Sequence, residues 1–235
     1  LACGLVDNVS ADLIVAAPAG SRQSLDATLD AILGWPIAHV SAYLLEFHAA
    51  TRFGRDLVAG RIVPTPDEQQ ARTYAHLVER LGTAGLEAYE LSNFARSGRE
   101  AVHNQRYWTR DPYLGIGPSA HSNVGAWRWA EQRDTATWVQ GVEAGEARLE
   151  DLEQLGEHEM AEERILLGLR RREGIDETVL AGRTRLVDEY VRAGLLTRSA
   201  GKVAATTEGT LRQRRLLQPV GQGGDPVGHV LDDVD

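Results

Sequence analysis

Strand and helix signals alternate over residues 8–92, and this alternation constrains the fold more than any other feature of the sequence. Apolar segments rich in β-branched or aromatic residues, which predict strands, are separated by segments with apolar residues at helical spacing. The strands are predicted at residues 8–17, 38–45 and 86–92, and the helices begin at Ser21 and Thr65. This order predicts an α/β fold with a parallel sheet and right-handed crossovers.

The second of these helices has the clearest start signal. Thr65 is predicted to be its N-cap, Pro66 its first residue, and Glu68 the side chain that closes a capping box. The helix is expected to end at Gly85. Residues 46–63, which precede it, show no regular pattern and are predicted to form an irregular connection.

Residues 103–121 follow the third predicted strand. Sheets of this kind bind ligands beyond the carboxyl ends of their strands. The segment holds two histidines, three aromatic residues and the turn Gly115-Ile116-Gly117-Pro118, with neither a helical nor a strand period. It therefore predicts one wall of a cofactor site, where the glycines let the backbone approach a neighbour closely.

Several side chains of this segment could contact a cofactor. Imidazole is a common axial ligand of haem iron, and aromatic rings pack on a macrocycle, so His103, Tyr107 and Trp108 suit a haem site. A hydrogen-bonded His103 that anchors a loop, with Trp108 as a hydrophobic plug, explains the same residues without a ligand. His121 is likewise open to two interpretations, a cofactor contact or a structural histidine.

Asp12 lies within the first predicted strand, among apolar residues. A carboxylate in such a place is costly unless it has a polar partner. It predicts either an arginine partner on a neighbouring strand or a polar ligand, such as a ribose or an amino group, at the end of the strand.

The composition excludes several classes of protein. A net charge of -9 argues against a nucleic-acid partner. The single cysteine, Cys3, excludes a disulfide framework and a multi-cysteine metal site within this chain, and indicates a cytoplasmic, reducing compartment. No apolar run approaches the ~18 residues that span a bilayer. The chain enters a predicted strand almost directly after Leu1, which indicates truncation.

The second part of the chain is predicted to be smaller and mostly helical. Helical periods at residues 157–172, 183–193 and 207–218 surround a hairpin signal at residues 195–205, as in a winged-helix-like module. We expect one domain over residues 1–150 and a second over residues 151–218. Residues 219–235 are rich in glycine and aspartate and are predicted to be disordered.

Three motifs of the chain resemble those of one family. They are Tyr89-Glu90-Leu91-Ser92-Asn93-Phe94-Ala95, His103-Asn104-x-x-Tyr107-Trp108 and Tyr113-Leu114-Gly115-Ile116-Gly117-Pro118-x-Ala120-His121. These motifs resemble the oxygen-independent coproporphyrinogen III oxidase-like family of radical SAM proteins. The second motif is similar to that of the family's haem chaperone branch, and the resemblance covers residues 1–218.

The resemblance implies the C-terminal part of a partial (β/α) radical SAM barrel, followed by a winged-helix-like domain. It implies a [4Fe–4S] cluster, S-adenosyl-L-methionine and haem as cofactors of the complete protein. Asp12 matches a carboxylate that contacts S-adenosylmethionine. His103, Tyr107 and Trp108 match the haem motif, with His103 as the iron ligand. His121 matches a loop that approaches the cofactor site.

The chain also departs from the family pattern. The loop that carries the three cluster cysteines is absent, so this chain is expected to supply no cluster ligands and to generate no radical alone. Val15-Ala16-Ala17 and residues 44–52 differ from the family's residues around the S-adenosylmethionine pocket.

The haem chaperone branch implies a protein that holds haem and delivers it to haem-accepting proteins. It leaves open a homodimer and peripheral membrane contact through the acceptors. Two other functions stay open. One is a coproporphyrinogen III oxidase, which decarboxylates its substrate by a radical route, and the other is a non-enzymatic regulator that uses the winged-helix-like module.

Overall fold

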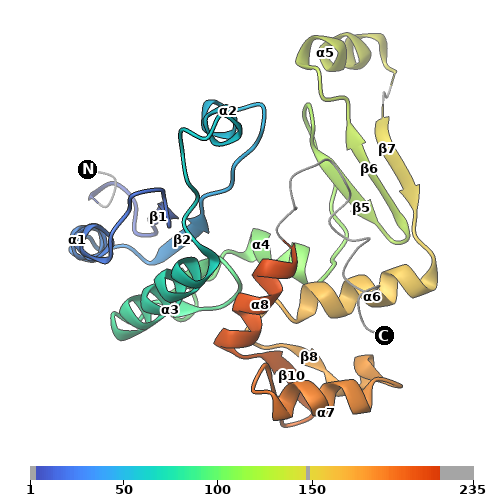
Figure 1. Ribbon diagram of the computed structural model, residues 1–235. Helices are drawn as coiled ribbons and strands as arrows, with labels where there is room; N and C mark the ends of the chain where they lie inside the picture. Colours follow the sequence, from blue (N-terminus) through green and yellow to red (C-terminus); the bar gives the residue numbers. More distant parts are fainter. Residues whose placement is uncertain (1–3, 147–148, 218–235) are drawn as a thin grey trace. The chain divides into compact units, whose positions relative to one another are not determined.

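The computed structural model describes residues 4–146 and 149–217 (Figure 1). By proximity these residues form two compact units. The first contains residues 4–100, 185–198 and 205–217, and the second contains residues 101–146, 149–184 and 199–204. Cys3 and the predicted tail at residues 219–235 lie outside the described residues. The expected domain boundary after residue 150 stays a prediction.

The first unit is built on a four-stranded sheet in the order β1-β2-β4-β3. β1 (Ser10–Val15) and β2 (His39–Leu44) are parallel and are connected by helix α1 (Arg22–Leu33). Ser21 is the N-cap of α1, because its hydroxyl accepts a hydrogen bond from the backbone of Ser24. The predicted strand–helix–strand unit is therefore confirmed.

Helix α3 (Asp67–Thr83) begins later than predicted. Pro66 is its N-cap and makes no side-chain capping bond. The Thr65 hydroxyl donates instead to the Ala16 carbonyl, 2.8 Å away, so it ties the helix start to the end of β1. The segment 46–63 is also not irregular throughout. It contains the short helix α2 (Arg52–Val58), which Thr51 caps through the backbone N–H of Gly54.

The prediction of one long parallel third strand is wrong. Residues 86–95 form two short strands, β3 (Glu87–Ala88) and β4 (Asn93–Ala95), which pair with each other, and β4 runs antiparallel to β2. The chain reverses because the Tyr89 N–H donates to the Asn93 carbonyl and Glu90 accepts from the backbone of Ser92. A polar turn of this kind has no strand period, and it divides the predicted strand.

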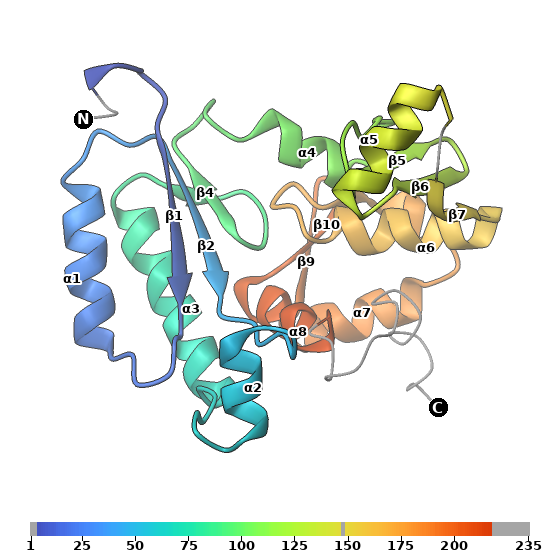
Figure 2. The same cartoon turned by 90° about the horizontal axis from the view of Figure 1, so that it is seen from above.

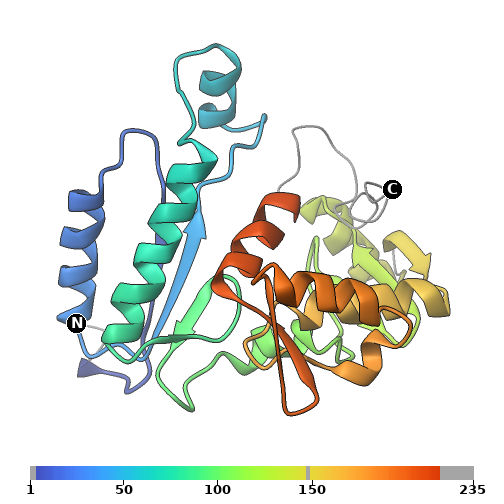
Figure 3. The same cartoon turned by 60° about the horizontal axis from the view of Figure 1, so that its bottom comes forward.

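Helices α1 and α3 lie along the same face of β1 and β2, as two views show (Figure 2, Figure 3). Apolar residues from these elements form the core of the first unit. Its fully buried members are Leu29, Val40, Ala42, Leu77, Leu81, Leu86 and Phe94. The sheet face that the helices cover therefore supplies the hydrophobic free energy of this unit.

The second unit begins with helix α4 (Val102–Trp108), so the prediction that residues 103–121 lack a helical period is wrong for their first part. An antiparallel sheet follows, in the order β5 (His121–Val124), β6 (Trp127–Glu131) and β7 (Leu149–Gln154). β7 ends at Gln154, two residues before Gly156, the N-cap of the next helix. Helix α5 (Thr135–Ala144) is capped by Asp134, and the helix predicted over residues 157–172 is present as α6 (Glu157–Gly168).

The remaining elements confirm the helices and the hairpin predicted near the C-terminus. β8 (Ile175–Asp176), β10 (Lys202–Ala205) and β9 (Leu196–Ser199) form a sheet in the order β8-β10-β9. The helical elements are η2 (Glu177–Leu180), α7 (Thr184–Arg192) and α8 (Thr207–Leu217). None of the helices in the described ranges is long and apolar enough to cross a membrane.

His39 is a buried titratable group on β2, in the sheet of the first unit. Its Nδ1 lies 2.8 Å from the Ser10 hydroxyl and its Nε2 lies 2.8 Å from the Tyr89 hydroxyl. Burial lowers the pKa of His39 below its ordinary value of 6.5, and the nearby Asp12 carboxylate opposes this shift.

Replacing His39 with glutamine should flatten the pH dependence of stability below about pH 6.5. In this range the unfolded wild type binds a proton that folded His39 does not, so its free energy of unfolding falls as the pH falls, by at most about 1.4 kcal/mol per pH unit. Urea unfolding at several pH values measures this slope. Equal slopes for the wild type and His39→Gln would contradict the assignment.

β1 is an edge strand within the described sheet, and Ile14 on it is 67% exposed. An unpaired edge with an apolar side chain is a template for association. We predict that the chain self-associates or melts without cooperativity, and that Ile14→Lys reduces the association. Val58→Lys, which changes an exposed valine on α2, is the control. Sedimentation velocity measures the outcome, and a wild-type monomer with a sharp two-state melt would contradict it.

Candidate cofactor site

Helix α4 places two predicted site residues on one face. His103 and Tyr107 are one helical turn apart, and side chains at this spacing are neighbours. The Tyr107 hydroxyl lies 2.9 Å from Nε2 of His103. Their rings meet edge to face, with centroids 4.9 Å apart. The imidazole and the hydroxyl that the sequence predicted to contact haem therefore form a hydrogen bond with each other in this structure.

Tyr113 forms a second aromatic wall beside this pair. Its ring packs edge to face on Tyr107 at a centroid distance of 4.7 Å. Its backbone N–H and carbonyl both pair with Asn123, which fixes it to β5. Burial, with a smaller contribution from Tyr107, raises the pKa of the Tyr113 hydroxyl, so this group stays protonated near neutral pH.

A cavity of about 550 Å³ opens beside these rings. Its lining combines aromatic and aliphatic side chains with one imidazole and one guanidinium: His103, Arg106, Tyr107, Pro112, Tyr113, Leu114 and Val124. Small-molecule and cofactor sites have this size and this mixture of apolar walls with few polar groups. Leu114, which lines the cavity, is 68% exposed, so part of the rim of the cavity is also apolar.

Gly115 of the glycine turn packs closely against protein. A Cβ on Gly115 would approach the His121 carbonyl oxygen to 2.3 Å, and the Gly115 N–H donates to the Ser122 hydroxyl. The close neighbour of Gly115 is therefore strand β5, whereas a Cβ on Gly117 would meet nothing within 4 Å. His121 itself starts β5 opposite Ala130, is exposed, and does not line the cavity.

Trp108 lies on the other side of α4. The guanidinium of Arg170 stacks 5.1 Å from the centre of its ring. On the same side, Gln105 accepts a hydrogen bond from Arg171. Trp108 does not line the cavity, and these contacts anchor α4 to the region that follows α6. The structure thus separates Trp108 from His103 and Tyr107.

A buried ion-pair network holds the loop that follows α4. Arg110 and Arg128 both donate to the carboxylate of Glu163, at 2.5 and 2.6 Å. Arg110 also has a positive φ of 59°, an uncommon conformation for a residue with a side chain. Arg110 donates in addition to the Gly125 carbonyl, so several contacts hold this backbone in place.

Asp12 belongs to the first unit, whereas the other predicted site residues belong to the second. Asp12 is exposed on β1 opposite Ser41, so the carboxylate is not desolvated as its apolar sequence neighbours predicted. It shares a polar sheet face with His39, Ser41 and Asn93, and the side-chain oxygen of Asn93 is buried without a hydrogen-bond partner in the described part of the chain. Sequence analysis missed this face, although polar and apolar residues alternate over residues 39–42.

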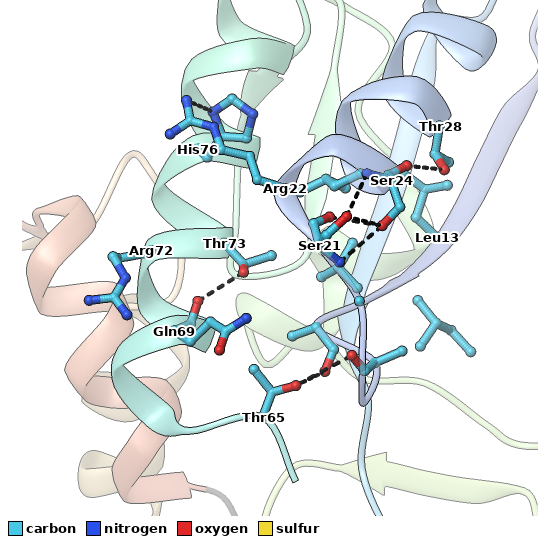
Figure 4. Close-up of a pocket in the computed structure, with 16 residues that line it drawn as sticks. Leu13, Ser21, Arg22, Ser24, Thr28, Thr65, Gln69, Arg72, Thr73 and His76 are labelled. Atoms are coloured by element: carbon cyan, nitrogen blue, oxygen red, sulfur yellow. Dashed lines mark hydrogen bonds between the residues drawn. The ribbon is translucent and has the colours of Figure 1, made fainter. Parts of the chain in front are cut away.

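A second cavity, of about 450 Å³, lies between α1, α3 and the end of β1 (Figure 4). Its polar groups bind one another. Arg22 reaches across to Nδ1 of His76, while Nε2 of His76 contacts Asp26 at 2.6 Å. Thr65 donates to Ala16 in the same view. The polar groups of both cavities have protein partners, and the cavity beside His103 is the stronger candidate because its lining includes His103 and Tyr107 of the motif at residues 103–108.

The residues of this chain do not fit an iron–sulfur cluster. Its sequence contains one cysteine, whereas the family's cluster takes three. Within the described ranges, no group of three or more His, Cys, Asp and Glu residues is arranged to hold a metal ion. A haem needs only one or two protein ligands, so this finding does not bear on the cavity beside α4.

No family model matches the chain. It is similar to proteins named heme chaperone HemW, with 32% identity over 205 residues to that of Mycobacterium tuberculosis and 28% over 214 residues to that of Bacillus subtilis. These alignments cover 87% of this chain and 53% and 56% of the relatives. The chain thus spans about half the length of the curated relatives it matches.

Radical S-adenosyl methionine domain-containing protein 1, mitochondrial, of Danio rerio is 31% identical over 178 residues, which cover 71% of this chain and 39% of that protein. Among solved structures, coproporphyrinogen III oxidase (HemN) of Escherichia coli, titled a radical SAM enzyme, matches with a TM-score of 0.67. The match covers 87% of this chain and 52% of that one. At 19% identity it shows the fold alone. The chain therefore belongs to the HemW-like branch of the oxygen-independent coproporphyrinogen III oxidase-like family of radical SAM proteins.

Proposed function

We propose that the cavity beside His103 binds haem, and that this chain is part of a haem chaperone that delivers haem to acceptor proteins. The observation that supports this most directly is the cavity itself, where His103 and Tyr107 lie among apolar side chains at an open rim. The relatives named heme chaperone support the same proposal.

The residues present fit a haem. Tyr113, Leu114 and Val124 offer apolar surface to a macrocycle, which is largely hydrophobic. Arg106 can pair with a haem propionate, because guanidinium and carboxylate groups match in geometry and charge. His103 and Tyr107 would supply the donor atoms for the iron. When bound, the haem is the cargo of the chaperone.

The other predicted cofactor contacts belong to the complete protein. We propose that Asp12 contacts S-adenosylmethionine from the polar sheet face, beside a [4Fe–4S] cluster whose ligands this chain lacks. His121 and Trp108 remain proposed cofactor-site residues. The geometry favours an indirect role for both residues, since His121 begins strand β5 and Trp108 packs under Arg170.

The first test is a haem titration of the chain, followed by Soret absorbance. We expect saturable binding by the wild type and an affinity loss of roughly 10–100-fold for His103→Ala, the range seen when a group supporting a metal site is removed. His158→Ala, an exposed histidine on α6, is the matched control and should bind as the wild type does. Absence of saturable binding by the wild type would overturn the proposed function.

A second test concerns the haem carboxylates. Arg106→Gln should weaken binding of haem by roughly 10-fold, the equivalent of about 1.4 kcal/mol, and should leave binding of haem dimethyl ester nearly unchanged. Arg133→Gln, an exposed arginine of the same unit, serves as the control. Equal losses for haem and its ester would show that Arg106 acts through packing and not through a carboxylate.

A further inference from the structure

His103, which lines the cavity, has two ring nitrogens that could bind iron. Nε2 of His103 is the less hindered ring nitrogen, because both neighbouring ring carbons carry only hydrogen. It already forms a hydrogen bond with the Tyr107 hydroxyl, 2.9 Å away. Nδ1 lies next to the ring carbon that carries Cβ. A planar macrocycle centred on Nδ1 would therefore meet the Cβ and the helix backbone of His103 itself.

The Tyr107 oxygen can bind a ligand while it keeps its hydrogen bond to His103, because it has a further lone pair. Tyr107 is 36% exposed and lines the cavity, so a ligand can reach it. His103 contacts one side of its ring and Tyr113 packs against another, both edge to face. The side chain is thus held in place before any ligand binds, and this preorganisation reduces the cost of binding.

We infer that the Tyr107 oxygen is the ligand of ferric haem iron in this cavity, and that His103 is a positioning residue which supports it. The inference rests on the proposed haem function and refines it. Phenolate is an established class of haem ligand, as it is in catalase. The assignment keeps the observed His103–Tyr107 hydrogen bond, whereas ligation by His103 through Nε2 requires that bond to break.

The step balances without a redox partner. The bond between the Tyr107 oxygen and iron forms as the phenol O–H bond breaks, and the proton passes to Nε2 of His103. The resulting N–H donates back to the phenolate oxygen, and iron remains ferric. A histidine placed to receive this proton acts as the outer partner that orients and tunes a metal ligand.

Resonance Raman spectra of the chain with ferric haem test the inference. Wild type should show the vibrations of an iron-bound phenolate, and Tyr107→Phe should lose them together with most of its affinity. His103→Gln should keep these vibrations at shifted frequencies and bind roughly 10–100-fold more weakly, since it removes an outer partner and not the ligand. Tyr190→Phe on α7, where the tyrosine is 37% exposed, is the matched control.

Circular dichroism melts of each variant establish that it folds, and Tyr107→Phe keeps the ring that packs on Tyr113. A nitrogen-ligated spectrum that persists in Tyr107→Phe and vanishes in His103→Gln would overturn the inference while leaving the proposed function intact. Failure of the wild type to bind haem at all would overturn the proposed function, and the inference with it.

Discussion

The second unit depends on the carboxylate of Glu163, which is shared by Arg110 and Arg128. The Arg110 and Glu163 side chains are 7% and 12% exposed, so a lone charge there would be costly. Removing one partner of a buried ion pair costs about 3–5 kcal/mol. Through Arg110, this carboxylate fixes the loop that joins α4 to Tyr113. The position of Tyr113 beside His103 and Tyr107 therefore depends on an interaction outside the cavity.

Much of the first unit follows from local sequence signals. The apolar run over residues 8–17 and the Ser21 cap define a strand and a helix without tertiary information. The third predicted strand does not follow from such signals. The Ser92 N–H donates a hydrogen bond to the Glu90 carboxylate within a tight turn, and the spacing of apolar residues does not reveal this turn. Thr65 has the residue type of an N-cap, but the nearby Ala16 carbonyl takes its hydroxyl. In each case a contact between specific groups overrides local preference.

The site was predictable in its residues and not in its geometry. The motif that contains His103 and Tyr107 was evident in the sequence, but seven-residue α4, which makes them neighbours, was not. Arg106 lines the same cavity and could have been found from its helical spacing to His103. Trp108 follows Tyr107 directly, yet a helix turns consecutive residues to different sides. The motif therefore combines one pair that faces the cavity with one residue that anchors the helix.

If the cavity carries haem as proposed, exposed Leu114 at its rim has a consequence for the order of events in the transfer. A carrier that encloses its cargo must release it into water before another protein can take it up, so the release rate does not depend on the acceptor. An open apolar rim permits the acceptor to touch the cargo while the carrier still holds it. For haem bound in this cavity, the transfer rate would rise with acceptor concentration, as in an associative exchange.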